Sequence, residues 1–235
     1  MDERAPGTTW FERKGPLAAP DRRAFLKAGA LAGALTGAGL DAAAQQAQDA
    51  RAELAAYKPV FFSEAEWAFI LAACARLIPS EGEGPGALEA HVPVFLDRDL
   101  SGDFGAAADW YMEGPHQADA PAAFGFQSPL TPAQIYRQTI AAVDDWCRRA
   151  HQAVFAALDP VRQDEVLNAL QGGKLGLGPE LRDFFSLFLQ NTREGYFADP
   201  RHGGNRHMAA WRHIGFPGAR GAFLEWVGRH DQPYP

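Results

Sequence analysis

Two helix-start motifs, each followed by apolar residues at helical spacing, constrain the fold of this chain more than any other feature of its sequence. In the first, Ser63 and Glu66 form a capping box, in which the hydroxyl and the carboxylate each satisfy a backbone amide of the first turn. Apolar residues then recur every three or four positions until Pro79, namely Trp67, Ile70, Leu71, Cys74, Leu77 and Ile78. This pattern predicts a helix over residues 63–78 with one buried stripe.

Thr131 and Gln134 form the second capping box, and Pro132 stands at the first helical position. The apolar residues that follow share one face of a helix: Ile135, Val143, Trp146 and Cys147. We expect this helix to be long and to reach about Leu158.

A shorter amphipathic helix is expected over residues 92–100, with Asp97, Arg98 and Asp99 facing solvent. The segment that follows, Ser101 to Leu130, is rich in Gly, Pro and aromatic residues. We interpret it as an irregular excursion that its aromatic side chains fix to the body of the protein.

Two further helices are expected in the second half of the chain. Asp159 and Pro160 start one, and Gly172 and Gly173 end it with a left-handed cap. From Pro179 onward, apolar residues point in nearly every direction around a helix, which predicts a helix buried on all sides. No segment alternates as a strand does, so the predicted fold class is mostly α, an irregular helical bundle with long loops rich in Gly, Pro and aromatic residues.

Composition excludes several classes of function. The chain has 22 Lys and Arg against 29 Asp and Glu, a net charge of -7, so it offers no basic field to bind a polynucleotide. Cys74 and Cys147 are its only cysteines, too few for a four-ligand zinc site or an iron–sulfur cluster held by this chain alone. The two can form a disulfide between facing helices after export, or remain inert buried thiols, and the sequence favours neither.

Residues 1–44 have the organisation of an export signal. A basic motif is formed by Arg22, Arg23, Phe25, Leu26 and Lys27. An uncharged run over residues 28–40 follows, and small residues at Ala42 and Ala44 mark a cleavage site. The run is too short and too rich in glycine to hold itself in a bilayer.

This arrangement resembles the twin-arginine signal, with Asp21 where Ser or Thr is more usual. The resemblance implies export of an already folded protein to the periplasm. We therefore divide the chain into an export signal (1–44), a linker (45–62) and a single helical domain (63–235).

No familiar catalytic signature is present: the dinucleotide fingerprint, the phosphate loop, the nucleophile elbow and the H-E-x-x-H motif are all missing. His202, His207 and His213 are close in sequence, but their spacing spreads them around a helix. We interpret them as hydrogen-bonding residues of loops and predict no metal site. Asp144 and Asp145 diverge on a helix, so we expect both to be surface charges.

The C-terminal region contains two strings in a fixed order, G-Y-F-A-D-P over residues 195–200 and G-G-N-R over residues 203–206. With the residues that follow, they define a tail motif of Gly195, Phe197, Asp199, Pro200, Gly203, Gly204, Asn205, Arg206, Trp211, Gly215, Phe216, Pro217 and Gly218. Packing must order a segment so rich in glycine, because it has little regular structure of its own. Arg201, Arg206, Arg212 and Arg220 are suited to bind carboxylates, within the fold or on a partner.

The tail motif resembles the signature of the gluconate 2-dehydrogenase subunit 3 family, and the resemblance extends back to residues 63–96. It implies a non-catalytic small subunit of a periplasmic, membrane-associated complex that oxidises sugars, sugar acids or polyols. In such complexes a large flavoprotein of the glucose-methanol-choline type holds FAD, and a multihaem cytochrome c subunit commonly accepts the electrons. The small subunit carries the export signal, through which the twin-arginine translocon moves both chains.

Two hypotheses follow. In the first, this chain holds no cofactor, escorts its partner and docks on it through Ser101 to Leu130 and Glu194 to Arg220. In the second, it is a stand-alone periplasmic enzyme or ligand-binding module, with Asp199, His202 and Arg206 lining a polar pocket in the tail.

Overall fold

The structure is a computed structural model that describes residues 45, 47–80, 84–117, 120–124, 128–216 and 224. The chain divides into two units, Met1–Ala42 and Ala43–Pro235, and all described residues belong to the second. Several predicted residues lie outside the described ranges: Arg22, Arg23, Phe25, Leu26, Lys27, Ala42, Ala44, Pro217, Gly218 and Arg220. Within those ranges, no helix combines the length and the apolar character that a membrane crossing requires.

The described residues form helices and loops and contain no strand, which confirms the mostly α class. The α-helices are α2 (Glu64–Leu77), α3 (Val92–Ser101), α4 (Asp103–Ala106), α5 (Pro132–His151), α6 (Pro160–Gln171), α7 (Phe184–Phe197) and α8 (Ala209–His213). Short 3-10 helices are η1 (Ala122–Phe124), η2 (Phe155–Ala157), η3 (Pro200–His202) and η4 (Arg206–Met208). Residues 47–56 form a further helix before α2.

Both capping boxes are present. The Ser63 amide donates to Glu66 Oε2 at 2.8 Å, and the Ser63 hydroxyl accepts from the Glu66 amide. Thr131 and Gln134 make the same two bonds at the start of α5. The local sequence therefore determines where α2 and α5 begin.

Helix α5 ends at His151, earlier than expected, because Gln152 adopts a left-handed conformation with φ 60°. The chain then turns back, and the buried carboxylate of Asp144 accepts a hydrogen bond from the Phe155 amide at 2.9 Å. Phe155 is fully buried and its ring lies 4.6 Å from that of Phe69 in α2. The prediction that Asp144 is a surface charge is wrong, since this carboxylate holds the turn after α5. Asp145 is exposed, as predicted.

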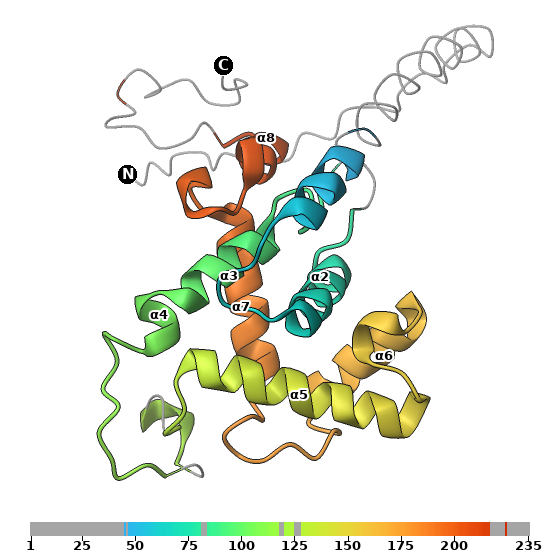
Figure 1. Cartoon of the computed structure of the whole chain (residues 1–235). Coiled ribbons are helices and arrows are strands. Elements are labelled where there is room, and N and C mark those ends of the chain that lie inside the picture. The colour runs from blue at the N-terminus through green and yellow to red at the C-terminus, as the bar shows by residue number, and fades with distance from the viewer. Residues whose placement is uncertain are drawn as a thin grey trace, which may run out of the picture. The chain divides into compact units, whose positions relative to one another are not determined.

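Helix α7 extends from α5 at one end to α8 at the other, and α3 packs along it (Figure 1). In the core, Asn191 of α7 donates to the Tyr136 hydroxyl of α5 at 3.0 Å. Buried residues follow one stripe of α7, including Phe184, Phe188, Asn191 and Tyr196. The prediction that this helix is buried on all sides is wrong, because its opposite face carries exposed Ser, Gln, Arg and Glu side chains. The helix also begins at Phe184 rather than at Pro179.

Asp97 of α3 is fully buried, which contradicts the expected solvent-facing position. Its Oδ2 accepts from the Tyr57 hydroxyl at 2.9 Å and from the Val60 amide at 2.8 Å. Its Oδ1 accepts from the amides of Phe61 and Phe62 at 2.9 and 3.0 Å. Four donors thus compensate the cost of burying one carboxylate. They hold residues 57–62, which belong to the predicted linker, against α3.

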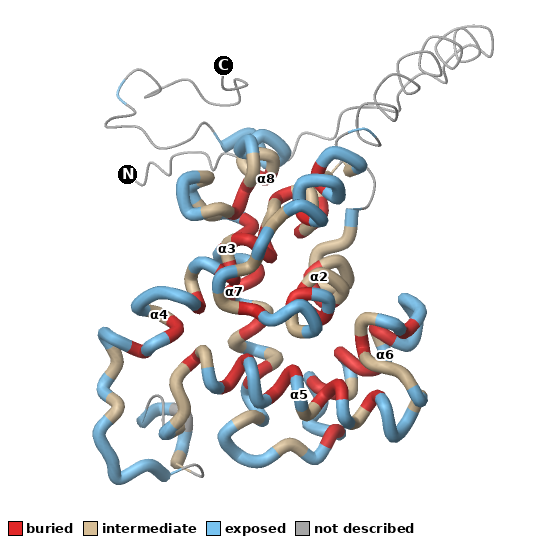
Figure 2. Tube along the Cα trace, in the orientation of Figure 1, coloured by how far each residue is buried: buried red, intermediate tan, exposed pale blue. Residues whose placement is uncertain are grey.

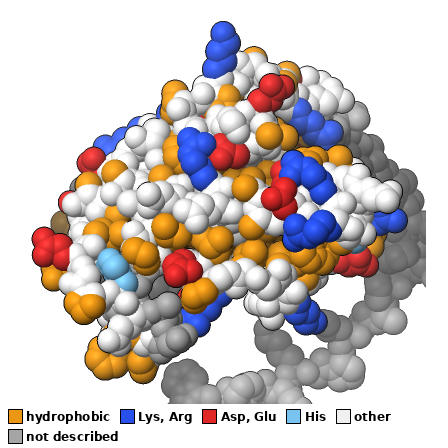
Figure 3. Space-filling view, turned by 60° about the horizontal axis from the view of Figure 1, so that its bottom comes forward, with side chains coloured by type: hydrophobic (Ala, Val, Ile, Leu, Met, Phe, Trp, Pro, Cys, Tyr) orange, Lys and Arg blue, Asp and Glu red, His pale blue; other side chains and the backbone are white. Residues whose placement is uncertain are grey.

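The segment between α4 and α5 is exposed along most of its length (Figure 2). The ring of Trp110 packs on that of Phe104 at 5.9 Å, as expected of a fixing contact. Tyr111 and Phe124, by contrast, are 79% and 72% exposed. The face at the bottom of Figure 1 carries charged side chains of both signs among hydrophobic ones (Figure 3).

Candidate functional site

The glycines of the tail motif allow its backbone to approach α3 and α7 closely. A Cβ at Gly195 would lie 2.7 Å from Cδ1 of Phe95, so this position sets the spacing of α7 and α3. A Cβ at Gly204 would lie 2.1 Å from the Gly195 carbonyl oxygen. At Gly204 the loop after α7 therefore packs backbone against backbone, which only glycine permits, whereas at Gly195 the close neighbour is an aromatic side chain.

Asn205 fixes the same loop from inside. It is fully buried and has a left-handed backbone with φ 44°. Its side-chain amide donates to the Ala198 carbonyl at 3.0 Å, and its Oδ1 accepts from the Ala210 amide at 2.9 Å. One side chain thus joins the residue that follows α7 to the start of α8. Asparagine suits this position because it tolerates left-handed geometry and can both donate and accept.

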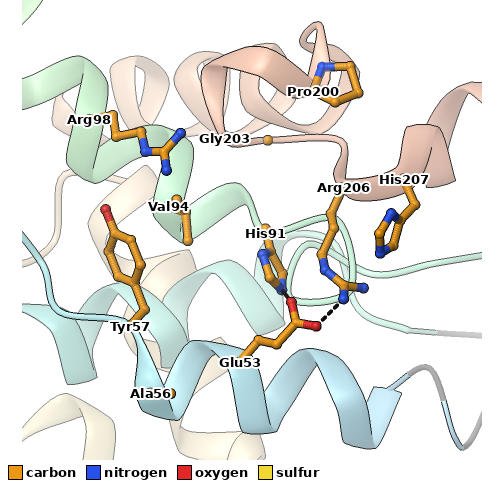
Figure 4. A pocket seen from close by; sticks show the side chains of 11 residues that line it. Glu53, Ala56, Tyr57, His91, Val94, Arg98, Pro200, Gly203, Arg206 and His207 are labelled. Atoms are coloured by element: carbon orange, nitrogen blue, oxygen red, sulfur yellow. Dashed lines mark hydrogen bonds and ion pairs between the residues drawn. The ribbon is translucent and has the colours of Figure 1, made fainter.

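Arg206 follows directly and connects the loop to two distant segments. Its amide donates to the Ala90 carbonyl at 3.1 Å. Its Nη2 forms an ion pair with Oε1 of Glu53, which belongs to the helix over residues 47–56 (Figure 4). Of the two alternatives for Arg206, a carboxylate within the fold or one on a partner, the structure shows the first.

His91, which precedes α3, lies beside this ion pair. Its Nε2 is 3.5 Å from Oε2 of Glu53, is buried and makes no hydrogen bond. Burial lowers the pKa of His91 to about 4, with further lowering by Arg206 and an opposing effect of Glu53. His91 is therefore neutral at neutral pH, and its contact with Glu53 is not an ion pair.

These residues lie along one side of a cavity of about 550 Å³ between the helix over residues 47–56, α3 and the tail loop. Its walls are formed by Glu53, Ala56, Tyr57, His91, Val94, Arg98, Pro200, Gly203, Gly204, Arg206 and His207. Arg98 and Tyr57 lie at one end, Glu53 and Arg206 at the other, and Val94 lies between them (Figure 4). We call this the Arg98 cavity.

The Arg98 cavity includes Arg206 of the second hypothesis but neither Asp199 nor His202. Asp199 caps η3 by accepting a hydrogen bond from the Arg201 amide at 3.1 Å. His202 accepts a hydrogen bond from Nε of Arg201 at 2.9 Å. His213 lies against Gly84, where an added Cβ would be 3.0 Å from the imidazole. Among the described residues, no group of three or more His, Cys, Asp or Glu side chains is arranged to hold a metal ion.

The other aromatic residues of the tail motif lie on the surface. The Trp211 indole donates to the Phe197 carbonyl at 2.9 Å, and its ring packs edge-on against Phe216 at 5.1 Å. Phe197, Phe216 and Ile214 are 44%, 41% and 58% exposed. We call Phe197, Trp211, Ile214 and Phe216 the C-terminal apolar patch. Gly215, between the last two, has a left-handed φ of 70°.

Both cysteines are free and fully buried. Burial raises the pKa of the Cys74 thiol far above its usual range, although a hydrogen bond to Thr192 opposes this. Burial likewise raises the pKa of Cys147, to about 11, and Asp144 adds to that effect. Neither thiol is therefore a reactive thiolate near neutral pH.

Sequence reasoning missed Glu53, His91 and Arg98 as members of one site. Glu53 falls in the presumed linker, although Ala50 and Leu54 are buried at a helical spacing of four. That spacing is the one signal that could have identified the helix. Nothing in the sequence indicates that this helix meets residues more than a hundred positions away.

The chain was compared with known protein families, curated proteins and solved structures. A protein-family model described as gluconate 2-dehydrogenase subunit 3 matches residues 64–218, which is more than half of the chain and includes the whole tail motif. No curated protein and no solved structure matches the chain.

Proposed function

Because the chain belongs to the gluconate 2-dehydrogenase subunit 3 family, and is thereby an accessory subunit of a dehydrogenase complex, we propose that it is non-catalytic and periplasmic. In this proposal, FAD is held by a large partner of the glucose-methanol-choline type, and a cytochrome c subunit can accept the electrons. The chain escorts the folded flavoprotein through the twin-arginine translocon and then stabilises it. The complex, not this chain alone, is associated with the membrane.

The observation that carries this proposal is that the tail motif fixes a loop to the helices and exposes apolar side chains on it. Gly195, Gly204 and Asn205 fix the loop rigidly against α3 and α7. The same motif then leaves the C-terminal apolar patch exposed. A surface of aromatic and aliphatic side chains on a well-fixed loop supports docking on another protein, because rigid aromatic residues dominate binding energy at interfaces.

The sequence supports the export part of the proposal. Arg22 and Arg23 form the basic motif of a signal that resembles those used for folded cargo. A chain that carries such a signal and docks on a folded partner can bring that partner across the membrane with it.

A copurification experiment tests the docking step. The full chain is tagged and produced together with its flavoprotein partner, and the flavin absorbance that copurifies is measured. Replacing Phe197 and Phe216 with Ser should reduce the recovered flavin at least about tenfold, because hot-spot residues contribute 2 kcal/mol or more each. Val161→Ser is the matched control, since Val161 is 68% exposed on α6, away from the tail.

The export step has its own readout in the same strain. Changing Arg22 and Arg23 to Lys should leave the flavoprotein's activity in the cytoplasmic fraction. Equal flavin recovery with the patch variant and with wild type would contradict docking through the tail. Normal arrival of the flavoprotein in the periplasm without the arginine pair would contradict the escort role.

A further inference from the structure

One cationic side chain of the Arg98 cavity, Arg98 itself, has no carboxylate partner among the described residues. Arg206 is paired with Glu53, and His91 is neutral. Arg98 forms no ion pair with any carboxylate of the described residues, although its neighbours on α3 are both aspartates. It is exposed, and its guanidinium points toward Gly203 and the interior of the cavity (Figure 4).

Asp97, one of the two aspartates next to Arg98 in sequence, cannot serve as its partner. Both oxygens of Asp97 are already used by four donors: the Tyr57 hydroxyl and the amides of Val60, Phe61 and Phe62. Arg98 instead interacts with the hydroxyl of Tyr57, which itself donates to Asp97. A guanidinium has five N–H donors, so this one contact leaves donors for a group from outside the chain.

The tail loop holds Arg98 in this position. Gly203 has a left-handed φ of 100°, and a Cβ there would lie 3.2 Å from Cδ and Nη1 of Arg98 and 3.1 Å from Cγ1 of Val94. The bare glycine thus leaves room for the arginine side chain to cross beneath the loop. The motif that resembles the family signature forms the roof over this arginine.

We propose that the Arg98 cavity receives a glutamate or aspartate side chain of the dehydrogenase's catalytic subunit, with the Arg98 guanidinium as its anchor. This inference rests on the proposed function and adds a second, polar contact to the docking surface. Two observations favour a protein segment as occupant. Three lining residues are exposed, Glu53, Ala56 and His207, so the cavity is open along one side. The loop that roofs it continues directly into the C-terminal apolar patch.

The energetics point the same way. An exposed pair between one arginine and a free carboxylate contributes little to binding in water. The same pair becomes much stronger when a surrounding interface excludes water, as is found for close charge pairs in protein complexes. A carboxylate presented by a partner that also covers the apolar patch meets this condition, whereas a free small acid does not.

The test compares two arginines in the copurified complex. The dissociation constant of tagged full-length chain from the flavoprotein is measured for wild type, for Arg98→Gln and for Arg149→Gln. Arg149 is the matched control, because it is exposed on α5, does not line the cavity and lies outside both segments that are expected to dock. We expect Arg98→Gln to weaken binding by tenfold or more and to reduce the salt dependence of the dissociation constant, and Arg149→Gln to change binding less than threefold.

A second substitution keeps the proposal testable if the first variant does not fold. Arg98→Lys keeps the charge but loses the two-pronged geometry, and we expect it to restore part of the affinity. If Arg98→Gln unfolds the chain, an Arg98→Lys variant that folds and binds with wild-type affinity and salt dependence would overturn the proposal of a two-pronged anchor.

The remaining outcomes distinguish a failure of the Arg98 anchor from a failure of the proposed docking function. If wild type does not bind the flavoprotein, the proposed function fails. If wild type binds and Arg98→Gln binds equally well, docking stands and the carboxylate anchor is overturned. Titration of the chain alone with sodium citrate supplies the third outcome, since saturable binding at micromolar concentration that Arg98→Gln abolishes would show a small-molecule site instead.

Discussion

The helices that begin with capping boxes and the loop over residues 198–208 are stabilised in opposite ways. Helices α2 and α5 begin where residues three positions apart satisfy one another, so their ends depend on local contacts. The loop has left-handed residues at Gly203, Asn205, His207 and Met208, and the last two have no intrinsic preference for this conformation. Its geometry depends on α3, α7 and the helix over residues 47–56. A helix end needs only the capping residues beside it, whereas the loop needs the rest of the fold to be in place.

The largest test of this difference is Gly204→Ala. The new Cβ would lie 2.1 Å from the Gly195 carbonyl oxygen, and neither backbone can move without separating the loop from α7. We expect a loss of about 4 kcal/mol in the free energy of unfolding, measured by urea denaturation.

Gly102→Ala is the control for that substitution. Gly102 has φ -103°, and a Cβ there would make only ordinary contacts, the nearest at 3.6 Å. Its effect should stay within about 0.5 kcal/mol. Equal stabilities of the two variants would show that the loop is not packed as described.

Asp97→Asn should rank second. The asparagine oxygen can still accept from two donors, but its amide group would face the other two, and buried donors would lose their partners. Unsatisfied buried groups cost about 1 to 3 kcal/mol each, so we expect a loss of about 3 kcal/mol in urea denaturation. The exposed Asp145 gives the matched control, and Asp145→Asn should cost about 0.5 kcal/mol or less. A loss in the free energy of unfolding below about 1 kcal/mol for Asp97→Asn would mean that residues 57–62 are held by other contacts.

Thr131→Ala tests a helix end that depends on local contacts, and its effect on the free energy of unfolding should be smaller. It removes one capping bond of α5 and leaves the core intact, so we expect a loss of about 1 kcal/mol in the same measurement. Thr131→Ser, which keeps the hydroxyl, should recover most of that loss. A loss above about 3 kcal/mol would contradict the view that this helix end is a local structure.

The same distinction explains how much the sequence could predict. Ser63, Thr131 and Asp159 mark their helix starts correctly, because each signal and its response lie within four residues. Asp97 and Asp144 were misplaced at the surface, because their donors come from segments 35 to 40 and 11 residues away and leave no trace in the helical pattern.

The candidate site is the extreme case of the same limitation. Glu53 and Arg206 are 153 residues apart in sequence. The tail motif identified Arg206, but only the folded chain shows that its carboxylate comes from the presumed linker. Spacing along the chain cannot encode a contact that exists only after α3, α7 and the N-terminal helix have assembled.

His91 gives an expected effect as small as that of Thr131 and sharpens the comparison by pH. Its pKa is lowered in the folded state to about 4, so the neutral ring stabilises the fold fully above pH 6.5, and this contribution is lost as pH falls from there through about 4. Between pH 7.5 and 5.0, wild type should lose about 1 kcal/mol more of its free energy of unfolding than His91→Asn, a value below full linkage because solvent reaches part of the ring. Asparagine tolerates the left-handed φ of 55° at this position and does not titrate. Urea denaturation of both proteins at the two pH values measures the difference. Equal losses of the free energy of unfolding in the two proteins would mean that protonated His91 is accommodated beside Glu53. The cavity wall would then be less tightly packed than the helical core.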